Sequence, residues 1–188
     1  MRIVGGKLRG LKLETPEGQD VRPTLDRARE TLFNILAHSS WGEGGLSPIQ
    51  DAKVLDVFAG TGALGLEALS RGAASVTFIE KQPHSLKQNI KAAKLPSLCL
   101  LVEADATVLP KASRQHDLAF LDPPFNQGLL PAALRSLVDQ SWLAKGALVV
   151  AEADAKEQNV FPNGFSALKE KKIGRINFHF LRYEGNRT

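Results

Sequence analysis

The chain of 188 residues is 43% hydrophobic and 23% charged, which is the composition of an ordinary globular protein rather than of a disordered one. Its longest uncharged stretches are too short to span a bilayer, its amino terminus lacks the apolar run of a signal peptide, and a single cysteine excludes a disulfide framework. We therefore expect a cytoplasmic protein without a membrane partner.

The formal net charge of +4 is unevenly distributed along the chain. Residues 1–30 contain seven basic and five acidic side chains, and residues 169–188 contain six and two, whereas acids outnumber bases in between. Basic ends of this kind are typical either of solvated tails or of surfaces that bind a polyanion such as a nucleic acid.

The amino-terminal residues predict a small basic hairpin followed by a helix. Two short runs, 2–4 and 8–13, flank a glycine pair, and a loop containing proline and glycine follows. Thr24 is a suitable N-cap for a helix whose apolar residues recur at helical spacing. We assign residues 1–40 to this extension and residues 41–188 to the main domain.

From residue 53 onward, short apolar runs alternate with helical patterns, which is typical of strands joined by helices into a mostly parallel sheet. Only Gly174 and Arg175 separate the last two runs, which predicts a closing antiparallel hairpin. The expected fold class is therefore α/β with a mostly parallel, seven-stranded sheet. The expected strands are 53–58, 75–80, 98–103, 117–121, 147–152, 165–173 and 176–183, with helices at 62–71, 83–94 and 129–141.

The first strand of the main domain runs into a glycine loop and then into a helix. In an open parallel sheet, ligands bind in the crevice beyond the carboxyl ends of the strands, and glycines let the backbone approach them closely. Gly60, Gly62 and Gly65 fit the spacing of a dinucleotide-binding loop, but this spacing alone does not distinguish between nucleotide-type cofactors.

Three acidic residues lie at or near the ends of successive predicted strands. Asp56 precedes the glycines, Glu80 ends the second strand and Asp105 follows the third. A carboxylate at Glu80 can accept both hydroxyl protons of a ribose, and Asp105 can accept from an adenine amino group. Each residue alone has a structural alternative, since Asp56 can cap backbone amides and the other two can be surface acids. Their joint placement favours a bound nucleotide-type cofactor.

The fourth strand of this series ends in Asp122-Pro123-Pro124-Phe125. An amino group on a base is a poor nucleophile because its lone pair is delocalised into the ring, and two acceptors that hold its N–H bonds can turn the lone pair toward an electrophile. Asp122 and the carbonyl of Pro123 can supply these acceptors, while Phe125 can stack on the base. The alternative interpretation of this segment is purely structural: it forms a rigid turn after a strand.

Together, the glycine loop with its preceding strand and the segment 122–125 resemble class I S-adenosylmethionine-dependent methyltransferases that methylate amino groups. The amino terminus is similar to that of the RsmD family, which comprises bacterial methyltransferases of guanine N2 in 16S ribosomal RNA. The matching residues there are Arg2 to Gly6, Arg9-Gly10, Arg22-Pro23-Thr24, Asp26-Arg27, Arg29-Glu30 and Leu32-Phe33-Asn34. The resemblance covers nearly the whole chain, but Leu11 and Lys81 depart from the residues usual in the family.

This resemblance implies a Rossmann-like class I fold, S-adenosylmethionine as cofactor, and 16S ribosomal RNA in a small ribosomal subunit or an assembly intermediate as partner, with guanine 966 as the target. The four histidines share no metal-ligand spacing, so we expect no metal. The expected cofactor contacts are Asp56, Phe58, Ala59, Gly60, Gly62, Glu80, Lys81, Asp105 and Ala106. The expected catalytic residues are Asp122, Pro123 and Phe125, and the expected RNA contacts are Arg2, Lys7, Arg9, Arg22, Arg27 and Arg29.

Three other functions fit parts of the sequence. A DNA or RNA adenine-N6 methyltransferase uses the same chemistry at an exocyclic amine, but DNA enzymes of this kind usually carry a separate target-recognition domain, for which this chain has no room. A nicotinamide dehydrogenase would need a substrate domain with a catalytic His or Lys. A non-enzymatic RNA-binding module would have no use for the acidic residues at the strand ends.

Overall fold

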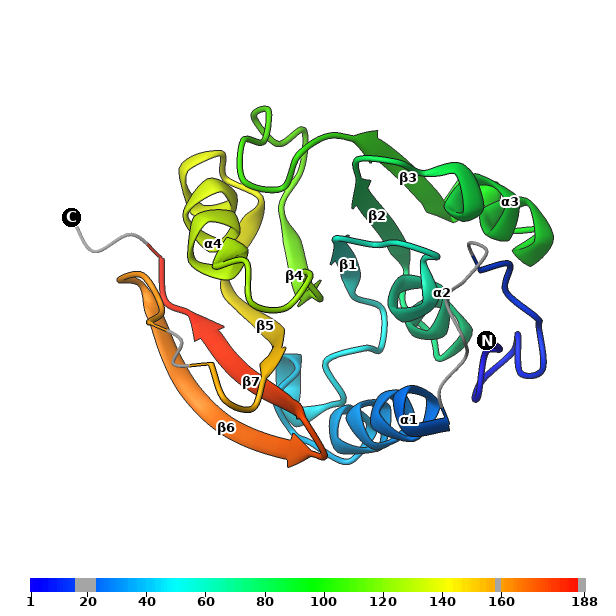
Figure 1. Cartoon of the computed structure of the whole chain (residues 1–188), viewed down its shortest axis with the longest axis horizontal. Coiled ribbons are helices and arrows are strands. Elements are labelled where there is room, and N and C mark those ends of the chain that lie inside the picture. Colours follow the sequence, from blue (N-terminus) through cyan, green and yellow to red (C-terminus); the bar gives the residue numbers. More distant parts are fainter. Residues whose placement is uncertain (16–22, 158–159, 186–188) are drawn as a thin grey trace.

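The computed structural model describes residues 1–15, 23–157 and 160–185 (Figure 1). At its centre is a seven-stranded sheet in the order β3-β2-β1-β4-β5-β7-β6. The first five strands along the chain are parallel, and β7 runs antiparallel to both of its neighbours. The predicted fold class is therefore confirmed. The strands are β1 (Lys53–Val57), β2 (Ser75–Glu80), β3 (Cys99–Glu103), β4 (His116–Leu121), β5 (Leu143–Asp154), β6 (Phe165–Ile173) and β7 (Ile176–Tyr183).

Helices cover both faces of this sheet (Figure 1). Three of them pack on one face and the fourth packs on the other, so each face has its own hydrophobic cluster. Phe33, Phe78 and Phe120 belong to the cluster beneath the three helices, whereas Trp142 belongs to the opposite one. The α-helices are α1 (Pro23–Ala37), α2 (Ala63–Ser70) and α3 (His84–Ala93) on the first face and α4 (Leu129–Asp139) on the second. Short 3-10 helices occupy Glu43–Gly45 and Pro96–Leu98.

Several boundaries differ from the prediction by one or more residues, and two of these differences have identifiable reasons. Helix α1 begins at Pro23, so Thr24 lies inside it rather than at its N-cap. Proline suits this first position because its missing N–H would have no partner there. Strand β5 begins at Leu143, well before the predicted Ala147, because backbone pairing with His116 of β4 extends it past an irregularity in register.

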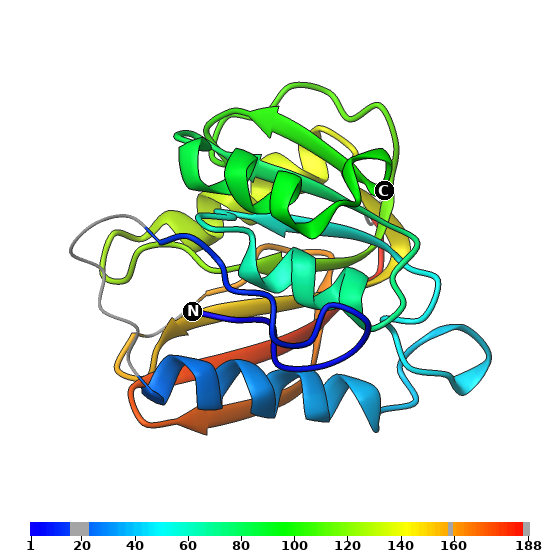
Figure 2. The same cartoon turned by 90° about the vertical axis from the view of Figure 1, so that its right-hand side faces the viewer.

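The amino-terminal segment forms a hairpin-like turn and not two regular strands. Arg2 and Lys12 form an isolated antiparallel bridge, and the backbone N–H of Ile3 donates to the carbonyl of Leu11. Figure 2 shows this segment crossing beside α2, above α1. Ile3 and Leu13 are buried in the cluster that α1 shares with the sheet. The segment thus contributes to the core of the main sheet, and the division into two domains at residue 40 stays a prediction.

Within the described ranges, no helix combines the length and the apolar character needed to cross a membrane. Nor do those ranges contain a group of three or more His, Cys, Asp or Glu side chains arranged to hold a metal ion.

Candidate functional site

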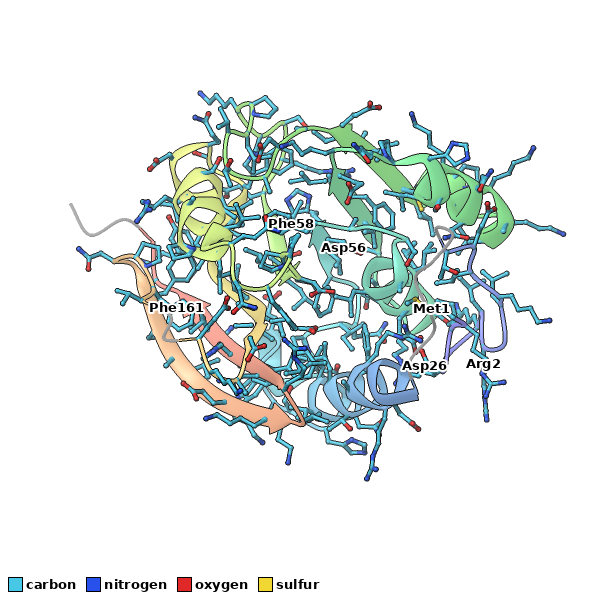
Figure 3. All side chains as sticks on the ribbon, in the orientation of Figure 1. Met1, Arg2, Asp26, Asp56, Phe58 and Phe161 are labelled. Carbon is cyan, nitrogen blue, oxygen red and sulfur yellow. The ribbon has the colours of Figure 1, made fainter. Side chains whose placement is uncertain are left out.

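A cavity of about 220 Å³ lies beside the carboxyl ends of β1, β4 and β5. The glycine loop forms part of its wall, Met1 and the start of α1 form another part, and Ile176 and Phe178 of β7 contribute as well. Figure 3 shows Asp56 and Phe58 near the middle of the molecule, with Met1 and Asp26 beside the end of α1. The predicted site residues that line this cavity are Asp56, Phe58, Ala59, Gly60, Asp122 and Arg29.

A larger hollow, of about 510 Å³, lies at the opposite end of the sheet, where the loop before β1 meets the first residues of β5. Two of the charged side chains in its lining already make hydrogen bonds inside the protein. Arg182 donates to the carbonyls of Gly146 and Trp41. Asp117 accepts a hydrogen bond from the backbone N–H of Lys53. We therefore place the candidate site in the smaller cavity, where the residues singled out by the sequence converge.

Asp56 is held at the base of the cavity by β1. Its side chain points to the α2 face of the sheet, where Oδ2 accepts the backbone N–H of Gly65 at 2.8 Å. Burial raises the pKa of this carboxyl well above its ordinary value, the hydrogen bond from Gly65 opposes the rise, and the charges of Asp122 and Glu80 add to it. Asp56 therefore has the structural role considered above, because it accepts a hydrogen bond from a backbone amide of α2. It also lines the cavity.

The glycines of the loop serve two different purposes. Gly62 has φ of +79°, and a Cβ there would lie 2.5 Å from Cδ1 of Leu86, so the protein's own packing requires glycine. Gly60 also has a positive φ, +56°, but a Cβ there would meet only the carbonyl of Phe58, at 3.9 Å. Open space next to Gly60 is where a ligand can approach the backbone.

Glu80 supports the loop and keeps acceptor capacity. One carboxylate oxygen accepts the backbone N–H of Gly60 at 2.8 Å, and the other accepts that of Gln82 at 2.9 Å. Each carboxylate oxygen has a second lone pair. Glu80 can therefore still accept from a ribose hydroxyl while it fixes the glycine loop.

Asp105 and Lys81 are joined to each other, which the sequence did not predict. Nζ of Lys81 lies 2.7 Å from Oδ2 of Asp105, and Thr107 donates to Oδ1 through both its backbone and its hydroxyl. The hydrogen bond from Lys81 and those from Thr107 lower the pKa of Asp105 to about 2. Ala106, the neighbouring predicted contact, is buried at 3% exposure. None of these three predicted contacts lines the cavity, so they form a separate rim at the ends of β2 and β3.

Asp122 follows β4 directly and lines the cavity. Its backbone N–H donates to the carbonyl of Val57, which ties the end of β4 to β1. Although solvent reaches part of the residue, the protein around the carboxyl displaces much of its water, and this raises the pKa of Asp122 to about 6. A carboxyl with this pKa is largely an acceptor at neutral pH and a donor under mildly acidic conditions.

The rest of the segment 122–125 lies beside the cavity rather than in its wall. Pro123 is buried, and Phe125 is partly buried against the cluster beneath α1. The guanidinium of Arg175 lies 6.0 Å from the centre of the Phe125 ring, at the outer limit of a cation–π contact. The part of the ring that stays accessible is what a stacking base would use.

Glu152 is a site residue that the sequence analysis missed. It lies on β5, lines the cavity and is partly buried. Burial and the nearby charge of Asp122 raise its pKa well above the ordinary value. The available signal was its place at the end of the predicted strand 147–152, the same position that drew attention to Glu80.

The predicted RNA contacts separate into two groups. Arg2, Lys7, Arg9 and Arg27 are exposed. Arg29 is only 6% exposed, lines the cavity and is engaged inside the protein, so it does not share a surface with the others. Arg22 lies outside the described residues.

Comparison with known proteins gives one family and several relatives. A family with the description "Conserved hypothetical protein 95" matches residues 1–182. The chain is 38% identical to "Ribosomal RNA small subunit methyltransferase D" of Escherichia coli K12, over 98% of this chain and 90% of that protein. Solved structures include a "Putative methyltransferase yhhF from Escherichia coli", with 38% identity, 99% of both chains covered and a TM-score of 0.81.

A more distant structure shows how widely the fold is shared. The N-methyltransferase NodS of Bradyrhizobium japonicum, solved with S-adenosyl-L-homocysteine, is 14% identical to this chain. Its TM-score is 0.65, with 92% of this chain and 94% of that chain covered. At this identity the likeness concerns the fold alone.

Proposed function

The chain belongs to the RsmD family, whose sequence pattern matches residues 1–182, and on this basis we propose its function. It transfers a methyl group from S-adenosylmethionine to the exocyclic N2 amine of a guanine in 16S ribosomal RNA. The observation that carries the proposal is that one cavity contains both the glycine loop and Asp122 at the end of β4. A cofactor site and an acceptor for an amine therefore adjoin each other.

The residues of this site fit the proposed cofactor. Gly60 has open space beside it, Glu80 keeps free lone pairs, and the rim at Asp105 offers further polar groups. When bound, S-adenosylmethionine supplies an electrophilic methyl group. The name of the E. coli relative, a ribosomal RNA methyltransferase, supports a methyl-donating cofactor for the present chain.

Asp122 and the carbonyl of Pro123 would hold the two N–H bonds of the target amine. Holding them in this way turns the nitrogen lone pair away from the ring, which makes the amine a better nucleophile. The amine must also lose a proton once its nitrogen has formed the new bond. The Asp122 carboxyl is a suitable acceptor for this proton because its pKa is raised and because it lies in the same cavity. Glu152 lines this cavity too, and the charge of Asp122 raises the pKa of Glu152.

The exposed basic residues of the amino-terminal segment are the proposed RNA surface. Arg2, Lys7 and Arg9 lie on the hairpin-like turn, and Arg27 lies on the exposed side of α1. Their charges supply the sequence-independent part of RNA affinity. A ribosomal substrate also places the enzyme in the cytoplasm, with a small subunit or an assembly intermediate as partner.

Two measurements test the proposal. Calorimetry should show binding of S-adenosylmethionine and S-adenosylhomocysteine, with no binding of NAD or FAD. Incubation with labelled S-adenosylmethionine and ribosomal material from cells lacking the enzyme should then yield N2-methylguanosine, at guanine 966 if the family resemblance holds in detail. Recovery of N6-methyladenosine would instead establish the adenine alternative, and tight NAD binding would refute the cofactor.

A further inference from the structure

Arg29 is the one basic side chain among the described residues that line the cavity. One nitrogen of its guanidinium, Nη2, donates to the carbonyl of Arg2 at 2.7 Å and to Oδ1 of Asp26 at 2.9 Å. Its Nε, in contrast, is buried and has no hydrogen-bond partner among the residues that the structure describes. The guanidinium is therefore only partly satisfied.

An unpaired donor of this kind is unusual. The great majority of buried polar atoms have a hydrogen-bond partner, and leaving a charged donor without one is costly. The side chain is also held in place, because its bonds to Arg2 and Asp26 fix the guanidinium at the start of α1. A guanidinium that is fixed in this way in the wall of a cavity can hold an anionic group of a ligand.

The surroundings identify the charge of this ligand group. Asp56, Asp122 and Glu152 all line the same cavity, so an additional acidic group would be repelled from most of its wall. The guanidinium of Arg29 provides a part of the cavity wall at which an anionic group is favoured. A guanidinium presents paired N–H donors in a fixed plane, which matches a carboxylate.

We propose that Arg29 binds the carboxylate of the amino-acid end of the cofactor and that it does not bind RNA. This inference rests on the proposed cofactor. The amino-acid end of S-adenosylmethionine carries an ammonium group and a carboxylate, and the cavity offers acids for the first and Arg29 for the second. A phosphate of an RNA strand would have to reach a side chain that is 6% exposed and covered by the amino-terminal segment.

The test compares two ligands that differ only in this carboxylate. S-adenosylhomocysteine is titrated into the full-length protein by calorimetry, and so is its decarboxylated analogue, which keeps the adenosine, the sulfur and the amine. In Arg29→Gln, the affinity for S-adenosylhomocysteine should fall by about 10- to 100-fold, as expected for removal of a charged hydrogen bond. The affinity for the decarboxylated analogue should stay within about twofold of that of the unaltered protein.

Glutamine is chosen because it removes the guanidinium and its charge but keeps a polar side chain at this position. Arg27→Gln is the matched control, since Arg27 is an exposed arginine of the same helix that does not line the cavity. Its substitution should leave the affinity for both ligands unchanged and flatten the salt dependence of RNA binding, which Arg29→Gln should not do.

Each other outcome is decisive. Equal decreases in affinity for both ligands in Arg29→Gln, or a decrease for neither, would overturn the carboxylate assignment, the first in favour of a purely structural role. A flattened salt dependence in Arg29→Gln would favour an RNA contact. If the unaltered protein bound neither ligand, the proposed function itself would fail, and Arg29 would not be the cause.

Discussion

The buried carboxylate of Glu67 accepts the backbone N–H of Val4 at 2.8 Å, across 63 positions of the chain. Its other oxygen accepts the N–H of Gly5 at 2.8 Å and faces Nε of Arg71 at 2.7 Å. Through this side chain, and through the hydrogen bonds of Ser70 to Gly5 and Leu8, α2 holds the amino-terminal segment in the position from which Met1 reaches the cavity. Docking of this segment is therefore part of how the site is built.

Glu67→Gln should loosen this attachment. The substitution keeps the shape of the side chain but replaces one acceptor by an NH₂ group that faces other donors. We expect the free energy of unfolding to fall by about 2 to 3 kcal/mol, measured by urea denaturation. Glu103→Gln is the control, because Glu103 is 59% exposed in its pair with Lys87 and should change stability by less than about 0.5 kcal/mol. A small effect of Glu67→Gln would mean that the hydrogen bonds of Ser70 to this segment, together with its apolar contacts, are sufficient to hold it.

The raised pKa of Asp122, about 6, should appear in the pH dependence of the reaction. Only the carboxylate form can accept both the N–H bond and, later, the proton of the amine. We therefore expect kcat/KM for RNA to fall as the pH is lowered through about 6, and Asp122→Asn to abolish transfer while cofactor affinity stays within a few-fold. Full turnover by Asp122→Asn would refute the proposed role of the segment 122–125.

The same carboxyl should affect stability in the opposite direction. Because its pKa is higher in the folded than in the unfolded protein, folding favours the protonated form, and stability decreases as the pH rises from the unfolded pKa to about 6. Asp122→Asn removes this pH-dependent destabilisation. Its melting temperature should exceed that of the unaltered protein at about pH 8, and the difference should shrink toward about pH 4. Asp139→Asn, at an exposed position on α4, should show no such trend.

Charge reversal on the proposed RNA surface should separate RNA binding from cofactor binding. In the double variant Arg9→Glu, Arg27→Glu, we expect a strong decrease in RNA affinity and a flatter salt dependence, by about one unit of slope for each phosphate interaction that the variant removes. The affinity for S-adenosylmethionine should not change. Lys111→Glu, an exposed site on the loop before β4, is the control. Normal RNA binding by the double variant would direct attention to the lysines of β6.

Phe125→Ala should weaken methyl transfer less than Asp122→Asn does. Removal of base stacking on this ring corresponds to about 1 to 3 kcal/mol in kcat/KM, with cofactor affinity unchanged. Because the ring also packs against the core, Phe125→Leu serves as the companion variant, which keeps apolar contact but removes the aromatic face. Equal activity of Phe125→Leu and the unaltered enzyme, at equal melting temperatures, would argue against stacking.

The sequence by itself determined the main features of the fold and the location of the site. Alternating apolar runs identified the seven strands of the sheet, because the burial pattern of a strand is local. The sequence also predicted that Asp56, Gly60 and Asp122 lie close together, because the carboxyl ends of parallel strands meet at one edge of a sheet. These three residues do line one cavity.

Only the tertiary structure decided which of several similar residues enter that cavity. Arg27 and Arg29 are both basic residues in the first turns of α1, yet the packing of this helix on the sheet exposes the first and buries the second. The pairing of Lys81 with Asp105 and the anchoring of Val4 by Glu67 likewise join segments that are distant along the chain. Such contacts depend on how the elements pack in three dimensions, and the pattern of charges or of apolar residues along the sequence does not predict this packing.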